Sequence, residues 1–82
     1  MQYRNLGKSG LKVSELSFGS WVTFNKQVDS GLAEKMFGKC LDAGVNFFDN
    51  ADGYERGESE IVLCKALKSL NNPRDSYCVS SK

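Results

Sequence analysis

The segment VNFFDNADGYERGESEIVLCKALKSLNNPRDSYCVSSK, residues 45–82, changes its apolar periodicity twice. Residues 45–49 (VNFFD) form a compact run with two aromatic residues, which is typical of a buried strand. A polar, glycine-bearing loop spans residues 50–58, and Ser59 is expected to cap the helix that follows. The apolar face of that helix consists of Leu63, Ala66, Leu67 and Leu70. Residues 71–73 (NNP) end the helix, and residues 77–81 (YCVSS) form another short strand.

The chain before residue 45 follows a similar order. Residues 3–6 and 11–14 flank the turn sequence GKSG, which predicts a β-hairpin. Residues 16–21 (LSFGSW) form the next strand candidate, Asp29 and Ser30 can cap a helix, and Gly44 is the expected helix stop. Apolar pairs recur every four residues in that helix: Leu32/Ala33, Met36/Phe37 and Cys40/Leu41.

These elements give the order hairpin, then β-α-β-α-β. Strands that alternate with helices predict a parallel sheet with right-handed crossovers, and the fold class is therefore α/β. The spacing fits the first turns of either a doubly wound sheet or a (β/α)8 barrel. Residues 1–82 are expected to form a single domain, because the sequence contains no linker or low-complexity segment.

Composition narrows the class of protein. The 82 residues carry 11 Lys and Arg against 10 Asp and Glu, a net charge of +1. This near-neutral balance argues against a nucleic acid or an anionic membrane as partner. No apolar run approaches the roughly 18–20 residues of a membrane span, and the first residues lack a signal-peptide core. We therefore expect a cytoplasmic protein that does not insert into a membrane.

Three cysteines and the lack of histidine limit the chemistry. Cys40, Cys64 and Cys78 form no CxxC pair and give a poor disulfide framework, so we expect buried structural thiols. Without histidine, this spacing does not suggest a zinc site, and no metal site is expected. Ser-His-Asp and Cys-His nucleophile arrangements are also excluded for this chain alone.

Three polar residues stand where parallel α/β folds gather their reactive groups, at the carboxyl ends of strands. Asp49 ends one strand, Tyr54 lies in the loop after it, and Lys82 follows another strand. A phenol beside an ammonium is a stronger acid, and a carboxylate can hold the ammonium charged and oriented. Such a group can protonate a carbonyl oxygen while another group delivers hydride.

Each of these residues also has a simpler interpretation. Asp49 beside Asn50 can be a turn former, Tyr54 can be an exposed ring in a polar loop, and Lys82 can be a solvated charge. The residue pattern alone leaves the reaction undecided.

Four sequence motifs add a resemblance that covers residues 3–82. LGKSGLKVSELSFGSW (6–21), DAGVNFFDNADGY (42–54), G-x-SE-x-x-L-x-x-AL (57–67) and PRDSYCVSSK (73–82) resemble the N-terminal part of the aldo-keto reductase superfamily. They are most similar to the branch that includes the voltage-gated potassium-channel β subunits. The resemblance implies an N-terminal hairpin that caps the bottom of a (β/α)8 barrel, followed by the first three strands and two helices of that barrel.

The same resemblance implies an NADPH-dependent reductase of small carbonyl compounds. By similarity, Tyr54 is the proton donor, Lys82 is the partner that lowers the pKa of Tyr54, and Asp49 anchors Lys82. Ser20, Trp21 and Gln27 match cofactor-contacting positions of this branch, and Asp49 is expected near the nicotinamide ribose.

The main departure from the family is length. A full barrel needs roughly 200–250 residues, and the family's catalytic histidine and the loops that grip the 2′-phosphate of NADPH lie beyond this stretch. Residues 1–82 alone are therefore expected to be inactive. Two other interpretations stay open: a non-catalytic channel β-subunit-like protein, whose partner is a channel's cytoplasmic domain, and a truncated gene product without its own activity. Whether the protein forms a homo-oligomer also stays open.

Overall fold

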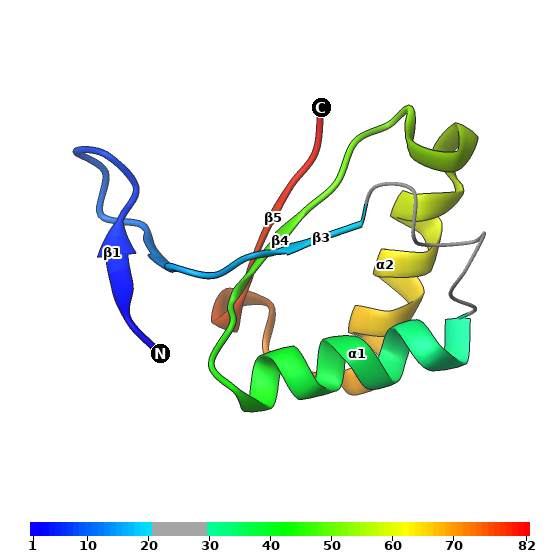
Figure 1. The fold of residues 1–82 in the computed structure, drawn as a ribbon, viewed down its shortest axis with the longest axis horizontal. Coiled ribbons are helices and arrows are strands. Elements are labelled where there is room, and N and C mark those ends of the chain that lie inside the picture. Colours follow the sequence, from blue (N-terminus) through cyan, green and yellow to red (C-terminus); the bar gives the residue numbers. More distant parts are fainter. Residues whose placement is uncertain (21–29) are drawn as a thin grey trace.

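The computed structural model describes residues 1–20 and 30–82, and the expectations for Trp21 and Gln27 lie outside the described residues. Figure 1 shows the order of the elements along the chain. They are β1 (Tyr3–Asn5), β2 (Lys12–Ser14), β3 (Phe18–Gly19), α1 (Ser30–Asp42), β4 (Phe47–Asp49), the 3-10 turn η1 (Tyr54–Gly57), α2 (Glu58–Leu70), the 3-10 turn η2 (Arg74–Ser76) and β5 (Cys78–Ser80).

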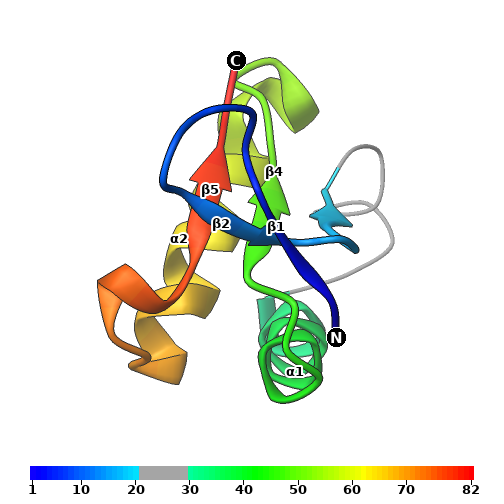
Figure 2. The same cartoon turned by 90° about the vertical axis from the view of Figure 1, so that its left-hand side faces the viewer.

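The strands form two separate sheets. β1 and β2 pair antiparallel as the predicted hairpin, and β3, β4 and β5 form a parallel sheet in that order. Both helices lie on one side of the parallel sheet, and the hairpin lies on the other side in the views of Figures 1 and 2. The predicted α/β order and the parallel direction of the strands are confirmed.

The core lies between the two helices and β4. Phe37 of α1 and Phe48 of β4 are fully buried, and their rings meet edge to face with centroids 5.2 Å apart. Phe18 packs against Phe37 at 5.3 Å, and Tyr77 lies 6.4 Å from Phe48. The remaining buried members of this cluster are Ala33, Val62, Leu63, Ala66 and Leu67. Because Phe48 points at the helices, its neighbour Asp49 projects from the opposite face of the sheet.

The boundaries of the elements differ from the predictions. The paired part of the parallel sheet is shorter than the predicted strands: β3 pairs two residues with β4, and β4 pairs three residues with β5.

Ser59 is not the cap of α2. The helix begins at Glu58 after Gly57, whose φ is 91°, and no side chain caps it. The Ser59 hydroxyl instead donates across the core to the backbone oxygen of Ser20, at 3.5 Å.

The expectation of buried cysteines is wrong for Cys64. All three thiols are free, Cys40 and Cys78 are half-buried, and Cys64 is exposed. The reason lies in the helical repeat: Leu63, Ala66 and Leu67 occupy the inner face of α2, and Cys64 projects beside that face.

The hairpin is attached near the amino-terminal end of β4. Tyr3 donates its hydroxyl hydrogen to the backbone oxygen of Gly44 at 2.7 Å. Ser14 and Asn46 exchange two hydrogen bonds, one from the Ser14 amide to Asn46 Oδ1 (2.8 Å) and one from the Asn46 amide to Ser14 Oγ (3.1 Å). The hairpin therefore leaves the carboxyl ends of the parallel strands open. Among the residues that the structure describes, no helix is long and apolar enough to cross a membrane.

Gly44→Ala is expected to destabilise the protein by about 1 kcal/mol or more. Gly44 has φ +94°, which disfavours any side chain, and an added Cβ would lie 2.7 Å from the Tyr3 hydroxyl. The control is Gly38→Ala inside α1, where the Cβ would make an ordinary 3.4 Å contact with Leu70. Alanine there is expected to stabilise by about 0.5–1 kcal/mol. Urea unfolding curves measure both effects, and equal stability of the two variants would contradict the role given to Gly44.

Candidate active site

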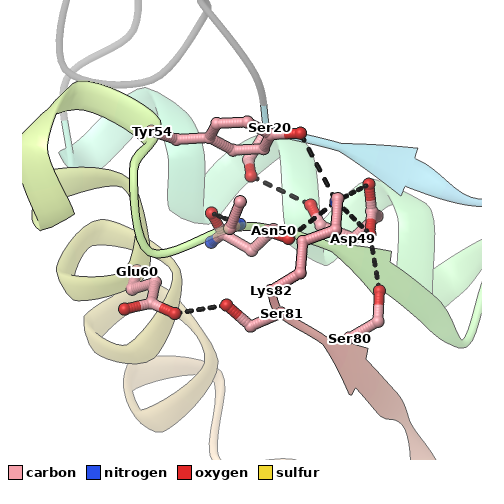
Figure 3. Close-up of polar contacts among 9 residues, drawn as sticks. Ser20, Asp49, Asn50, Tyr54, Glu60, Ser80, Ser81 and Lys82 are labelled. Atoms are coloured by element: carbon pink, nitrogen blue, oxygen red, sulfur yellow. Dashed lines mark hydrogen bonds and ion pairs between the residues drawn. The ribbon is translucent and has the colours of Figure 1, made fainter.

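The three predicted polar residues meet at the carboxyl ends of the parallel strands. Lys82 follows β5, and its Nζ lies 3.3 Å from both carboxylate oxygens of Asp49, the last residue of β4. The same nitrogen lies 3.4 Å from the Tyr54 hydroxyl oxygen. Figure 3 shows the ammonium between the carboxylate and the phenol. We call Asp49, Tyr54 and Lys82 the polar triad.

The loop between β4 and α2 brings Tyr54 to this place. Its 3-10 turn contains Glu55 and Arg56 with φ of 49° and 55°, a left-handed conformation that costs non-glycine residues on the order of 1–2 kcal/mol each. The turn folds the loop back over the sheet, so that Lys82 Nζ lies 5.3 Å from the centre of the Tyr54 ring. The ring is half-buried and its hydroxyl faces the ammonium.

Asn50 is a site residue whose sequence position indicated only a turn. Its backbone oxygen accepts a hydrogen bond from Lys82 Nζ at 3.1 Å. Its fully buried side chain donates to the backbone oxygen of Ser59 at 3.2 Å and accepts from the amide of Ala51 at 2.9 Å. The backbone of the loop is also tied to β5, because the Asp52 amide donates to the Lys82 oxygen at 2.7 Å. These bonds therefore fix the backbone of Asn50 and of Lys82, the two residues joined by the hydrogen bond from Nζ.

Two serines that precede Lys82 are further contacts missed from the sequence. Ser80 Oγ donates to Asp49 Oδ1 at 2.6 Å, and Ser81 donates to Glu60 Oε1 of α2. The two bonds point in opposite directions, because the alternation of side chains along β5 continues at Ser81, the residue that follows it. A run of small hydroxyl residues gave no signal in the sequence, since serine suits loops equally well.

Ser20 is buried next to the backbone of Asp49, one member of the polar triad. Only 2% of its surface is exposed, and its hydroxyl donates to the Asp49 backbone oxygen at 2.9 Å. In this arrangement Ser20 holds the end of β3 to the end of β4. Its predicted contact with a cofactor stays a prediction.

The pKa of Asp49 is lowered from its ordinary value, and the pKa of Lys82 is raised. The hydrogen bond from Ser80 is the main cause that lowers the pKa of Asp49, and Lys82 also lowers it, against an opposing effect of desolvation. Desolvation acts to lower the pKa of Lys82, but the hydrogen bonds and charges of Tyr54 and Asp49 together outweigh it and raise that pKa. Both groups are therefore ionised at neutral pH, with the ammonium held between an anion and a phenol.

This arrangement suits proton transfer to a ligand at the strand ends. The side chains of Asp49 and Lys82 remain 41% and 63% exposed, so the triad is open to a bound molecule. A phenol next to a fixed ammonium can give up its proton, because the ammonium stabilises the phenolate that remains. A separate cavity of about 280 Å³ lies beside α2 and β5 and is lined by residues that include Leu63, Leu67 and Val79. Asn50 also lines that cavity, but Asp49, Tyr54 and Lys82 do not.

The fold and the triad define a class of protein: a parallel α/β fold with a polar cluster at the carboxyl ends of its strands. The sequence model of the Aldo/keto reductase family matches residues 15–82. The chain belongs to the aldo-keto reductase family, as its motifs predicted.

Curated relatives place the similarity in one branch. Two plant proteins, each named "Probable voltage-gated potassium channel subunit beta", match all 82 residues. The protein from Oryza sativa subsp. japonica is 50% identical and that from Arabidopsis thaliana is 51% identical. The chain spans 25% of the length of each relative.

Solved structures confirm the predicted partial barrel. An aldo-keto reductase from Bacillus halodurans in its holo form matches 99% of this chain with a TM-score of 0.82 and 34% identity. A thermostable aldo-keto reductase in complex with the inhibitor epalrestat matches 99% of the chain with a TM-score of 0.81. The second match, at 22% identity, shows the fold alone. The chain covers 25% and 30% of these two structures.

Proposed function

We propose that these residues are the N-terminal part of an NADPH-dependent reductase that converts an aldehyde or ketone to the alcohol. The observation that carries this proposal is the polar triad, in which Lys82 Nζ lies within 3.4 Å of both Asp49 and Tyr54. Membership of the aldo-keto reductase family and the position of the triad at the strand ends support it. Because the chain spans 25% of its curated relatives, the activity is proposed for the complete barrel and residues 1–82 alone are expected to be inactive.

Each member of the triad has one task in this proposal. The Tyr54 hydroxyl donates its proton to the carbonyl oxygen of the substrate as that oxygen gains negative charge. Lys82 stabilises the phenolate that remains until solvent returns the proton. Asp49 keeps the ammonium charged and fixes its position, since both carboxylate oxygens lie 3.3 Å from Nζ.

In this proposal Asp49 and Ser20 are the described residues that would contact a nicotinamide cofactor. The bound cofactor would supply the hydride that the carbonyl carbon accepts. Asp49 can accept a hydrogen bond from a ribose hydroxyl, because its side chain is 41% exposed. Ser20, the other proposed cofactor contact among the described residues, is buried and its hydroxyl is bonded to the Asp49 backbone oxygen. Trp21 and Gln27, the other proposed cofactor contacts, lie outside the described residues.

A second candidate function follows from the names of the plant relatives. Two proteins about 50% identical to this chain are named as channel β subunits, which favours a regulatory protein that binds a channel's cytoplasmic domain. The triad is compatible with both functions. Co-purification of the complete protein with a channel tetramer would favour the regulatory role, and rapid aldehyde turnover without any partner would favour the reductase. Size-exclusion chromatography of the complete protein would also show whether it is a homo-oligomer.

Lys82→Met tests the reductase proposal in the complete barrel. Loss of the ammonium removes the charge that stabilises the Tyr54 phenolate, so kcat for aldehyde reduction is expected to fall at least about 100-fold. NADPH consumption in the presence of an aldehyde measures the effect. The matched control is Lys39→Met on the exposed side of α1, which should keep the wild-type rate. If Lys82→Met retains that rate too, Lys82 has no part in the reaction.

A further inference from the structure

Ser80 stands directly beside Asp49 in the parallel sheet. The register of β4 and β5 pairs these two residues, so their side chains project from the same face. Ser80 Oγ donates to Asp49 Oδ1 at 2.6 Å, and Figure 3 shows this bond approaching the carboxylate from the side opposite Tyr54. The same carboxylate oxygen also lies 3.3 Å from Lys82 Nζ.

The two donors differ in how firmly they can hold the carboxylate. The contacts from Lys82 to Asp49 are both 3.3 Å long, and the Lys82 side chain is 63% exposed. Ser80 is half-buried, has one rotatable bond before its oxygen and lies within a paired strand. A short side chain on a paired strand loses little conformational entropy when it forms a hydrogen bond, whereas lysine loses much more. The shorter bond from the stiffer donor therefore sets the orientation of Asp49.

We propose that Ser80 is a positioning residue, whose hydroxyl fixes the Asp49 carboxylate in the orientation that holds the Lys82 ammonium beside Tyr54. Its effect on catalysis rests on the proposed reductase function, but its effect on Asp49 does not. The loss of this bond leaves the Asp49 carboxylate free to rotate and weakens its ion pair with the Lys82 ammonium.

The charged groups around Asp49 give the direction of the pH effect. From β5 the ammonium of Lys82 faces the carboxylate, and from η1 the phenol of Tyr54 faces the ammonium. β3 and the following Ser20 bring no titratable side chain. Ser80 is the largest cause of the lowered pKa of Asp49. Removal of its hydroxyl is therefore expected to raise the pKa of Asp49 toward the value of an ordinary aspartate.

The test compares Ser80→Ala and Ser80→Thr in the complete protein. Carbon-13 labelling of aspartate carboxyls gives the pKa of Asp49 by NMR titration, and the spectrum of Asp49→Asn identifies its signal. In Ser80→Ala we expect a raised pKa and a kcat lowered about 2- to 10-fold, the value of one hydrogen bond, with the substrate KM unchanged. Ser80→Thr keeps the hydroxyl and should restore both quantities.

Ser81→Ala is the matched control, because Ser81 directly follows β5 and donates to Glu60 of α2 instead of Asp49. It should leave the pKa of Asp49 at its wild-type value. An unchanged pKa in Ser80→Ala, an equal rise in Ser81→Ala, or a threonine variant that behaves like alanine would each overturn the proposal. A wild-type protein without carbonyl reduction would refute the proposed function alone, since the titration still decides the role of Ser80.

Discussion

Tyr54→Phe is expected to lower the rate of carbonyl reduction by the complete barrel about 100- to 10,000-fold, the contribution of a positioned general acid. The substitution removes only the hydroxyl oxygen that lies 3.4 Å from Lys82 Nζ. The aromatic ring remains, and with it the packing of the 3-10 turn. Binding of NADPH, measured by fluorescence titration, should therefore stay near the wild-type affinity.

Tyr77→Phe is the matched control for this experiment. Tyr77 is half-buried and its ring packs 6.4 Å from that of Phe48, on the core side of the sheet. The same loss of a hydroxyl at that position should leave the turnover rate unchanged. Substantial turnover in Tyr54→Phe would show that another group donates the proton, and weaker NADPH binding in that variant would give the phenol a role in holding the cofactor.

Phe37→Ala is expected to destabilise the protein by about 3–5 kcal/mol, the usual cost of truncating a buried phenylalanine. The ring is fully buried between Phe18 and Phe48, with centroids at 5.3 Å and 5.2 Å. Both neighbours meet it edge to face, so the change removes two aromatic contacts and leaves a cavity between α1 and the sheet. The midpoint of urea unfolding measures the loss.

Leu32→Ala on the same helix serves as the comparison. Leu32 is 46% exposed, so truncation removes less buried surface and should cost no more than about 1 kcal/mol. Equal shifts of the unfolding midpoint for the two variants would mean that the aromatic cluster is not the centre of the core. A small effect of Phe37→Ala with a large effect of Leu32→Ala would place the stabilising surface on the other face of α1.

The polar triad was predictable because it depends on two local patterns. Apolar runs and helical repeats located the strands, and parallel strands bring their carboxyl ends to one edge of the sheet. Asp49 is the last residue of β4 and Lys82 lies two residues after β5, so this rule predicts that they lie close together. The position of Tyr54 was harder to predict, because it depends on the turn that contains Glu55 and Arg56. Both residues adopt left-handed conformations, which no pattern in the sequence predicts.

Two predictions for single residues of α2 failed. Ser59 was expected to cap a helix, but it is buried and donates to the backbone of Ser20. Cys64 was expected in the core, but the rotation of α2 places it outside. For Ser59 the local pattern suited two environments, and packing against a distant segment selected one of them. For Cys64 the helical repeat of α2 places Leu63, Ala66 and Leu67 inward and the thiol beside that face.

The sequence by itself determined the order of elements, the parallel sheet, the family and the three residues of the triad. Periodicity and motif spacing carry that information, because they arise from neighbours along the chain. Only the tertiary structure decided that Ser80 bonds the Asp49 carboxylate and that the backbone oxygen of Asn50 accepts from Lys82. These bonds depend on the register between strands that are 31 residues apart, as Asp49 and Ser80 are. A serine or an asparagine has the same local sequence signature whether or not such a partner stands opposite it.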